Sequence, residues 1–105
     1  MKSIMQRERK EDGVCYLCKK LHRDINPKIV FEHHVIFGTA NKRLSEKYGL
    51  KVFLCLYHHT EGKEAVHKNH ELARLLQADA QTAFEEKFPD KNFFEIFGRN
   101  YKGDV

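Results

Sequence analysis

Cysteine and histidine side chains are the residues of this chain that are best suited to chemistry. The 105-residue sequence contains three cysteines and seven histidines. Cys15 and Cys18 are separated by two residues, and Cys55 and His58 repeat that spacing in the second half of the chain. Two such pairs supply the four thiolate and imidazole ligands that a structural zinc ion prefers. The spacing therefore predicts a zinc site formed by Cys15, Cys18, Cys55 and His58, with the adjacent His59 as an alternative fourth ligand.

The number of cysteines argues against a disulfide framework, because three thiols cannot all pair within one chain. The first ten residues are charged rather than apolar, unlike a secretory signal peptide. No apolar run reaches the roughly 18 residues that indicate a membrane span. We therefore expect a cytoplasmic protein, in which a Cys-x-x-Cys pair indicates metal binding or redox chemistry. A thiol redox protein stays an alternative, although the sequence shows no thioredoxin-like unit.

Further histidines are left once a zinc ion has taken four ligands: His33, His34, His67 and one of His58 and His59. Adjacent side chains on a strand point to opposite faces, so we expect His33 and His34 to have different roles. One imidazole can bind a divalent cation, and the other can take a proton from water near neutral pH. This division of roles favours hydrolysis of a phosphodiester bond at a second metal centre.

The elements that must position these residues are predicted by composition and periodicity. Residues 29–37 are rich in β-branched and aromatic types and predict a strand, and residues 52–55 predict a second one. The two strands can pair as a hairpin across a long connection, 38–49, with a short helix at 44–48. Apolar residues at three- and four-residue steps predict a helix over 69–88, capped by Asn69 and ended by Pro89. The apolar cluster at 93–97 predicts a packing segment.

Charge is distributed unevenly along the chain, whose formal net charge is +4. Residues 1–52 carry 12 Lys and Arg against 6 Asp and Glu, whereas residues 53–105 carry 7 against 9. A basic half suits a polyanionic partner such as DNA or RNA. An ordinary solvated surface is the alternative interpretation of the same charges.

Three short segments together carry a resemblance to a known family. They are Cys15–Cys18, Glu32–Val35 with its adjacent histidines, and Leu54–His59. In combination they resemble the HNH endonucleases, and most closely the small HNH proteins carried by bacteriophages. The similarity covers residues 15–69 and extends more loosely through the helix to Phe88. It implies a phage-encoded nuclease that acts on DNA in the cytoplasm of a bacterial host.

The resemblance also implies a fold and a domain organisation. The fold would be a small zinc-stabilised α+β domain of the ββα-metal, treble-clef-like type, with a long C-terminal helix. In this fold a hairpin and a helix hold one divalent ion, such as magnesium or manganese. Residues 13–89 would form the nuclease domain, between a basic arm at 1–12 and an apolar and basic extension at 90–105.

Individual roles follow from the same resemblance, residue by residue. His34 falls where the family places its general base. His33, His59 and His67 fall at or near the positions of the ligands of the catalytic ion. His58 then becomes the fourth ligand of the structural zinc.

Two departures from the family pattern bear on the geometry of the site. The family's middle Asn has no counterpart in residues 48–51, and Asn41 is a candidate replacement in the connection. The stretch from Thr60 to Val66 is longer than the usual spacing between the last two metal ligands. Without the Asn, a non-catalytic zinc module that binds nucleic acid or a protein is the main alternative to a nuclease.

Affinity for DNA requires contacts to phosphate, which Lys and Arg side chains supply. Lys42 and Arg43 are the candidates closest in sequence to the histidine pair, and we favour Arg43.

Overall fold

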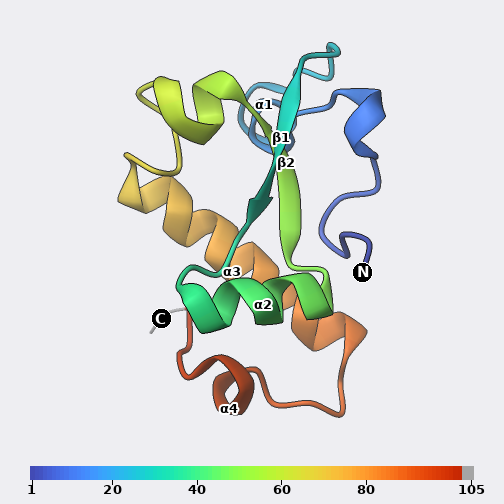
Figure 1. The fold of residues 1–105 in the computed structure, drawn as a ribbon, viewed down its shortest axis with the longest axis vertical. Helices are drawn as coiled ribbons and strands as arrows, with labels where there is room; N and C mark the ends of the chain where they lie inside the picture. The colour runs from blue at the N-terminus through green and yellow to red at the C-terminus, as the bar shows by residue number, and fades with distance from the viewer. Residues whose placement is uncertain (103–105) are drawn as a thin grey trace.

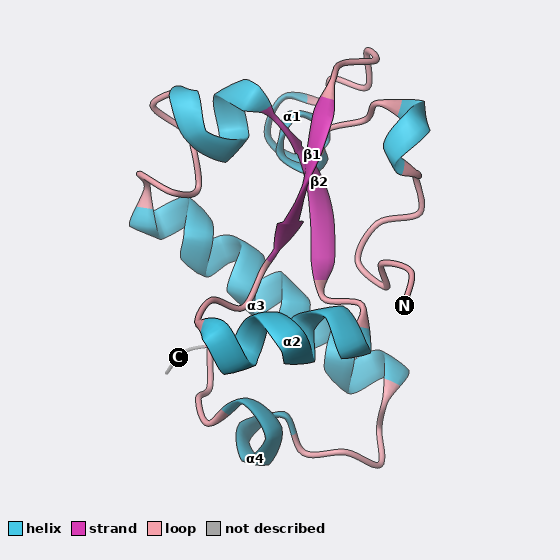
Figure 2. Cartoon of the chain, viewed as in Figure 1, coloured by secondary structure: helices cyan, strands magenta, loops and turns pink. Residues whose placement is uncertain are grey.

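A two-stranded antiparallel sheet lies at the centre of the computed structural model, which describes residues 1–102 apart from the side chain of Thr39 (Figures 1 and 2). Strand β1 (Val30–His34) pairs with strand β2 (Lys51–Cys55), and their register places Val30 opposite Cys55 and His34 opposite Lys51. The prediction of a hairpin across a long connection is confirmed. The fold is a small α+β domain, as expected.

Helices surround this sheet (Figures 1 and 2). They are α1 (Tyr16–His22), α2 (Thr39–Tyr48), α3 (His70–Lys87) and α4 (Phe93–Phe97), with a 3-10 helix, η1 (Lys10–Asp12), and a π-helical turn, η2 (Tyr57–Glu61). The long helix α3 crosses behind the sheet, whereas α2 and α4 lie toward one end of the hairpin and α1 toward the other (Figure 1). Among the described residues, no helix is long and apolar enough to cross a membrane.

Helix α3 confirms the prediction for residues 69–88 closely. The side chain of Asn69 accepts a hydrogen bond from the backbone N–H of Leu72 at 3.1 Å, which caps the first turn. Phe84 is fully buried at the centre of the core, with the rings of Tyr48 and Phe93 packed edge-on against it. The apolar stripe of α3 therefore packs against both α2 and α4.

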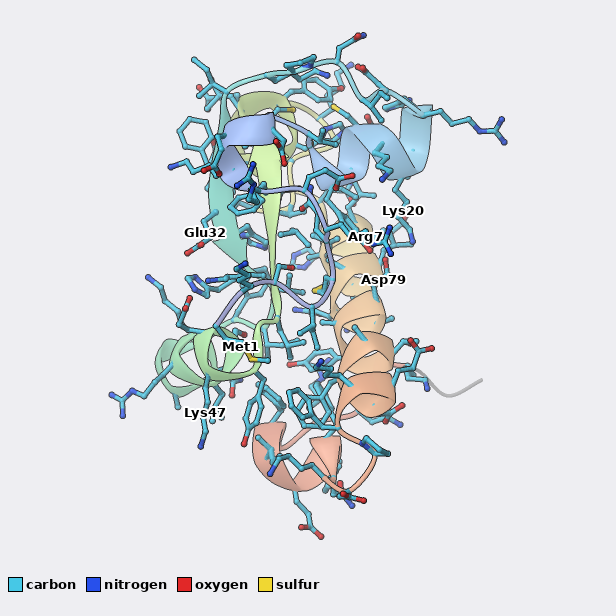
Figure 3. The ribbon with its side chains drawn as sticks, turned by 90° about the vertical axis from the view of Figure 1, so that its right-hand side faces the viewer. Met1, Arg7, Lys20, Glu32, Lys47 and Asp79 are labelled. Carbon is cyan, nitrogen blue, oxygen red and sulfur yellow. The ribbon has the colours of Figure 1, made fainter. Side chains whose placement is uncertain are left out.

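Side chains of α1 attach that helix to α3 (Figure 3). The carboxylate of Asp79 accepts a hydrogen bond from the Tyr16 hydroxyl at 2.7 Å and pairs with the Lys20 ammonium at 2.8 Å. Cys18 in α1 and Cys15 at its N-cap are consequently held against the same core that supports the hairpin.

Helix α2 is longer than the sequence suggested, ten residues rather than the predicted 44–48. Its first turn is polar and has no apolar period, so periodicity alone misses it. The helix ends at Gly49, whose φ of 73° lies in the left-handed region that favours glycine. Leu44 and Tyr48 face the core, which leaves Lys42 and Arg43 exposed.

The N-terminal arm packs along the open side of β2. The Gln6 side chain accepts a hydrogen bond from the backbone N–H of Phe53 and donates one to the carbonyl of Val14, both at 2.9 Å. The backbone N–H of Ile4 bonds to the carbonyl of Gly49 at the same distance. These bonds cover an edge of the sheet that would otherwise expose unpaired backbone groups.

The predicted packing segment forms α4, which buries Phe93 and Phe97 and leaves Phe94 exposed. The C-terminal extension was expected at 90–105, and its last three residues, 103–105, lie outside the described residues.

Candidate metal centres

The first cluster brings together the four residues expected to bind zinc. Cys15 caps the N-terminus of α1, and Cys18 lies in the first turn of that helix. Cys55 is the last residue of β2, and His58 belongs to η2. All four side chains are buried. Each Cys or His pair thus lies on a short turn, as its two-residue spacing predicts.

The distances within this cluster are compatible with tetrahedral zinc. Nδ1 of His58 lies 3.6 Å from the Sγ of Cys15, 3.4 Å from that of Cys18 and 3.5 Å from that of Cys55. The sulfurs of Cys18 and Cys55 are 3.7 Å apart. With zinc–sulfur bonds of about 2.3 Å and zinc–nitrogen bonds of about 2.0–2.1 Å, a tetrahedron separates sulfur from nitrogen by about 3.6 Å and two sulfurs by about 3.8 Å. Of the two candidates for the fourth ligand, His58 and His59, it is His58 that lies in this cluster.

Electrostatics of the thiols also favours a cation. Burial raises the pKa of the Cys15 and Cys18 thiols, and neighbouring thiols add to the effect at Cys18. Three negative thiolates at this spacing would repel one another unless a divalent cation lay between them. The cluster therefore fits a structural zinc ion by geometry and by donor chemistry.

Glu64 lies beside this centre and was not recognised from the sequence. Nε2 of His58 is buried and makes no hydrogen bond, and the Oε1 of Glu64 is 3.4 Å away. The same Oε1 lies 3.2 Å from Nε2 of His22, whose ring stacks on that of His58. Nothing in the spacing of Glu64 signals this contact, because the loop after η2 creates it.

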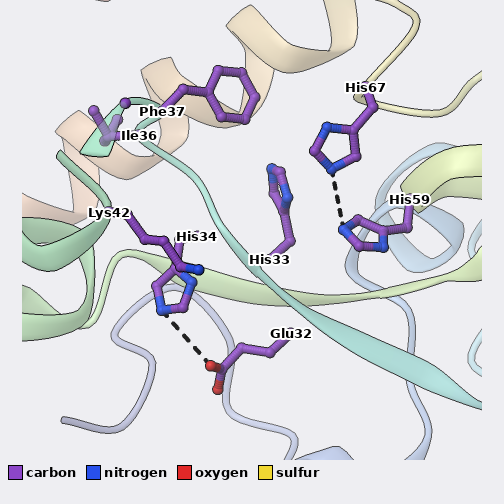
Figure 4. Close-up of a pocket in the computed structure, with 9 residues that line it drawn as sticks. Glu32, His33, His34, Ile36, Phe37, Lys42, His59 and His67 are labelled. Atoms are coloured by element: carbon purple, nitrogen blue, oxygen red, sulfur yellow. Dashed lines mark hydrogen bonds and ion pairs between the residues drawn. The ribbon is translucent and has the colours of Figure 1, made fainter. Parts of the chain in front are cut away.

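The second cluster consists of His33, His59 and His67 (Figure 4). The Nε2 atoms of His59 and His67 are 3.2 Å apart, and one nitrogen from each of the three rings lies within 4.8 Å of the others. Nε2 of His33 is buried and has no hydrogen-bond partner among residues 1–102. A buried nitrogen without a partner beside two more imidazoles is the arrangement that a divalent cation would satisfy.

The long stretch between His59 and His67 closes into a compact loop. Gly62 packs directly on the ring of Tyr57, where a Cβ atom would overlap the ring. The backbone N–H of Val66 then bonds to the carbonyl of His58 at 2.8 Å. These two contacts turn the chain back, so His67 meets His59 despite the longer spacing noted in the sequence.

Burial favours the neutral form of the His33 and His59 imidazoles. Burial, together with the neighbouring histidines, lowers the pKa of His33 to about 3. Burial and His67 also lower the pKa of His59. Neutral rings offer their lone pairs to a metal at neutral pH without first losing a proton.

His34 points away from the three-histidine cluster but borders the same hollow. An open pocket of 440 Å³ lies where β1 ends (Figure 4). Its lining includes His33, His34, His59 and His67, together with Phe37 and Lys42. Nε2 of His34 lies 2.8 Å from Oε1 of Glu46, a residue of α2 that sequence reasoning did not single out. The four histidines expected at the second centre therefore share one pocket.

Two further residues of α2 bear on the pocket. Ser45 is fully buried, and its hydroxyl lies 3.3 Å from both the backbone N–H and the carbonyl of Ile36, just beyond β1. Lys42 lines the pocket, whereas Arg43, which we favoured from the sequence, is exposed on α2 and is not part of the lining.

Comparison with known proteins identifies no relative. The chain matches no protein family, no curated protein and no solved structure.

Proposed function

We propose that this protein is a metal-dependent endonuclease of the HNH type, which hydrolyses phosphodiester bonds in DNA. The observation that carries the proposal is the pocket in which three imidazoles converge beside a fourth, next to a separate and closed Cys/His cluster. Closed sets of four ligands are typical of structural sites, whereas catalytic metals keep open positions for substrate. The Cys/His cluster is of the closed type, and the three-histidine cluster is of the open type.

The residues of the pocket divide into three roles. His33, His59 and His67 hold a divalent ion, which when bound stabilises negative charge on the phosphate and on the leaving oxygen. His34 accepts a proton from the attacking water. Lys42 offers an ammonium group at the rim of the pocket for a neighbouring phosphate.

The ligand set bears on the identity of the ion. Magnesium prefers oxygen ligands, whereas imidazoles suit transition metals. Three histidines therefore favour a transition-metal ion over magnesium at this centre. Imidazole suits zinc, iron and nickel better than it suits manganese, so cleavage assays should include zinc as well as manganese.

The proposal extends to the finer fold. We assign β1, β2 and the turn η2 with its following loop to the ββα-metal unit. In place of the family's middle Asn, the buried Ser45 ties the chain beyond β1 through its two contacts with Ile36. Asn41 is half-buried on α2 and makes no hydrogen bond through its side chain among the described residues. Ser45 is therefore the better candidate for that tie.

Incubation of the protein with supercoiled plasmid and manganese tests the activity. We expect nicking that a chelator abolishes and that His34→Ala reduces about 10²- to 10⁴-fold, the usual contribution of a general base. His70→Ala is the matched control, because His70 is an exposed histidine at the start of α3, outside the pocket. Undiminished cutting by the His34 variant would remove that residue from the mechanism.

A non-catalytic zinc module remains a second candidate, favoured by the missing middle Asn. It predicts binding of nucleic acid or of a protein partner that depends on the closed cluster and needs neither His34 nor a second ion. Retention of plasmid without nicking, under every divalent ion tested, would support this module.

A further inference from the structure

The imidazole of His34 is held by a charged network from the neighbouring strand and helix. Nε2 of His34 lies 2.8 Å from Oε1 of Glu46. Lys51, the cross-strand partner of His34, in turn contacts both carboxylate oxygens of Glu46, at 3.1 and 3.0 Å. Its side chain is only 11% exposed, so this ammonium is a fixed rather than a mobile anchor for Glu46.

The ionised state of Glu46 determines which ring nitrogen carries the proton. Hydrogen bonds from His34 and Lys51 lower the pKa of the Glu46 carboxyl to about 2, so the group is a carboxylate at neutral pH. A carboxylate can only accept hydrogen bonds. Nε2 of His34 must therefore be the donor, and in a neutral imidazole the lone pair then lies on Nδ1.

The other nitrogen of the ring is free for chemistry. The edge of the His34 ring that carries Nε2 is turned toward Glu32, away from His59 and His67 (Figure 4). None of the side chains described for residues 1–102 makes a hydrogen bond to Nδ1 of His34. His34 nevertheless lines the pocket that the three metal-binding histidines share.

We infer that Glu46 is a positioning residue, which holds His34 through Nε2–H so that Nδ1 stays available as the proton acceptor in the pocket. The inference rests on the proposed function for the role of His34, but the hydrogen bond itself can be measured without any cleavage. Glu46 and Lys51 together would then supply the orientation of the base, a task for which the sequence offered no candidate.

Glu32 provides a matched control for the charge of Glu46. Its Oε1 is 3.7 Å from the same Nε2, and its Oε2 is 3.4 Å from the same Lys51 ammonium. It therefore contributes a negative charge to the same neighbourhood without a hydrogen bond to His34. If the role of Glu46 were electrostatic only, Glu46→Gln and Glu32→Gln would have similar effects.

The activity test compares Glu46→Ala, Glu46→Gln and Glu32→Gln in the manganese-loaded protein. We expect kcat to fall about 10- to 100-fold in Glu46→Ala, because the base loses its orientation, while KM changes less than about twofold. The kcat of Glu46→Gln should lie between those of Glu46→Ala and the wild type, since the amide oxygen can still accept a hydrogen bond from Nε2–H. The kcat of Glu32→Gln should stay close to that of the wild type. Equal losses in Glu32→Gln and Glu46→Gln, or no loss in Glu46→Ala, would overturn the inference.

A second measurement separates this inference from the proposed function. In protein labelled with ¹⁵N-histidine, the Nε2–H proton of His34 should appear as a downfield resonance that is protected from exchange and absent from His34→Ala. The resonance should persist in Glu32→Gln and disappear in Glu46→Ala. If the wild-type protein cuts no DNA, the proposed function fails, yet this resonance still decides whether Glu46 holds His34. If no such resonance exists in an active wild-type protein, the inference fails alone.

Discussion

The two clusters differ in their surroundings, although adjacent residues of one turn contribute to both. His58 points its Nδ1 at three buried thiols, whereas His59 lies half-buried with the exposed His67 at the edge of an open pocket. A closed set of ligands leaves no position for a substrate, and an open set does. The difference teaches that a single π-helical turn can place one histidine in a closed, buried cluster and the next histidine in an open one.

Loss of the closed centre should have the largest effect. Structural zinc contributes about 10–16 kcal/mol in zinc-finger peptides, as much as the whole stability of about 5–15 kcal/mol of a typical domain. We therefore expect Cys15→Ser to abolish cooperative thermal unfolding and to reduce bound zinc. His67→Ala should leave the melting temperature within a few degrees of wild type, because that side chain is exposed. Calorimetry measures the unfolding transition, and elemental analysis measures the bound zinc. A Cys15→Ser protein that melts like the wild type would contradict the structural role of the closed cluster.

Replacement of each of the two adjacent histidines, His58 and His59, by alanine provides the next test. His58→Ala should lower stability and zinc content, although less than Cys15→Ser, because three thiolates still hold the ion. His59→Ala should keep the tightly held zinc and weaken the second divalent ion by more than about 100-fold, since even indirect changes around a metal commonly weaken it 10- to 100-fold. Competition with a chromogenic chelator measures both affinities. If His59→Ala removed the zinc held by the thiols, the assignment of the two rings would be wrong.

Gly62→Ala should affect the open centre selectively. A Cβ atom at this position would overlap the Tyr57 ring, and relief of such crowding costs about 1–3 kcal/mol. The loop that carries His67 would shift, so we expect weaker binding of the second ion with the zinc retained. The double variant Tyr57→Ser, Gly62→Ala removes the overlap and should restore binding, as titration with manganese can show. A Gly62→Ala protein that binds manganese normally would contradict the packing argument.

Local patterns in the sequence explain the parts that could be predicted. The period of Leu76, Ala80 and Phe84 defines α3, and the Cys/His pairs define the closed cluster, because each pattern lies within a few residues. The opposite orientations of His33 and His34 follow from their adjacency on a strand.

The remaining features depend on contacts between distant segments. Glu46 reaches His34, and Ser45 reaches Ile36, only because α2 packs against the end of β1. No spacing rule connects these pairs, and the polar first turn of α2 hides the length of the helix. The contact of Glu64 with His58 likewise depends on the path of a loop.

Glu64→Gln should give the smallest effect. This variant tests whether the zinc affinity of the closed centre depends on residues beyond its four ligands. Loss of a carboxylate that bonds the second nitrogen of a metal-binding histidine commonly lowers metal affinity 10- to 100-fold. Glu64 is partly exposed and 3.4 Å from Nε2 of His58, so we expect a loss of zinc affinity of about tenfold at most. Glu61→Gln is the matched control, since Glu61 is an exposed carboxylate at the end of η2. Equal rates of zinc release from the two variants would show that the four ligands alone fix the His58 ring, whereas faster release from Glu64→Gln would show that even the closed centre depends on its surroundings.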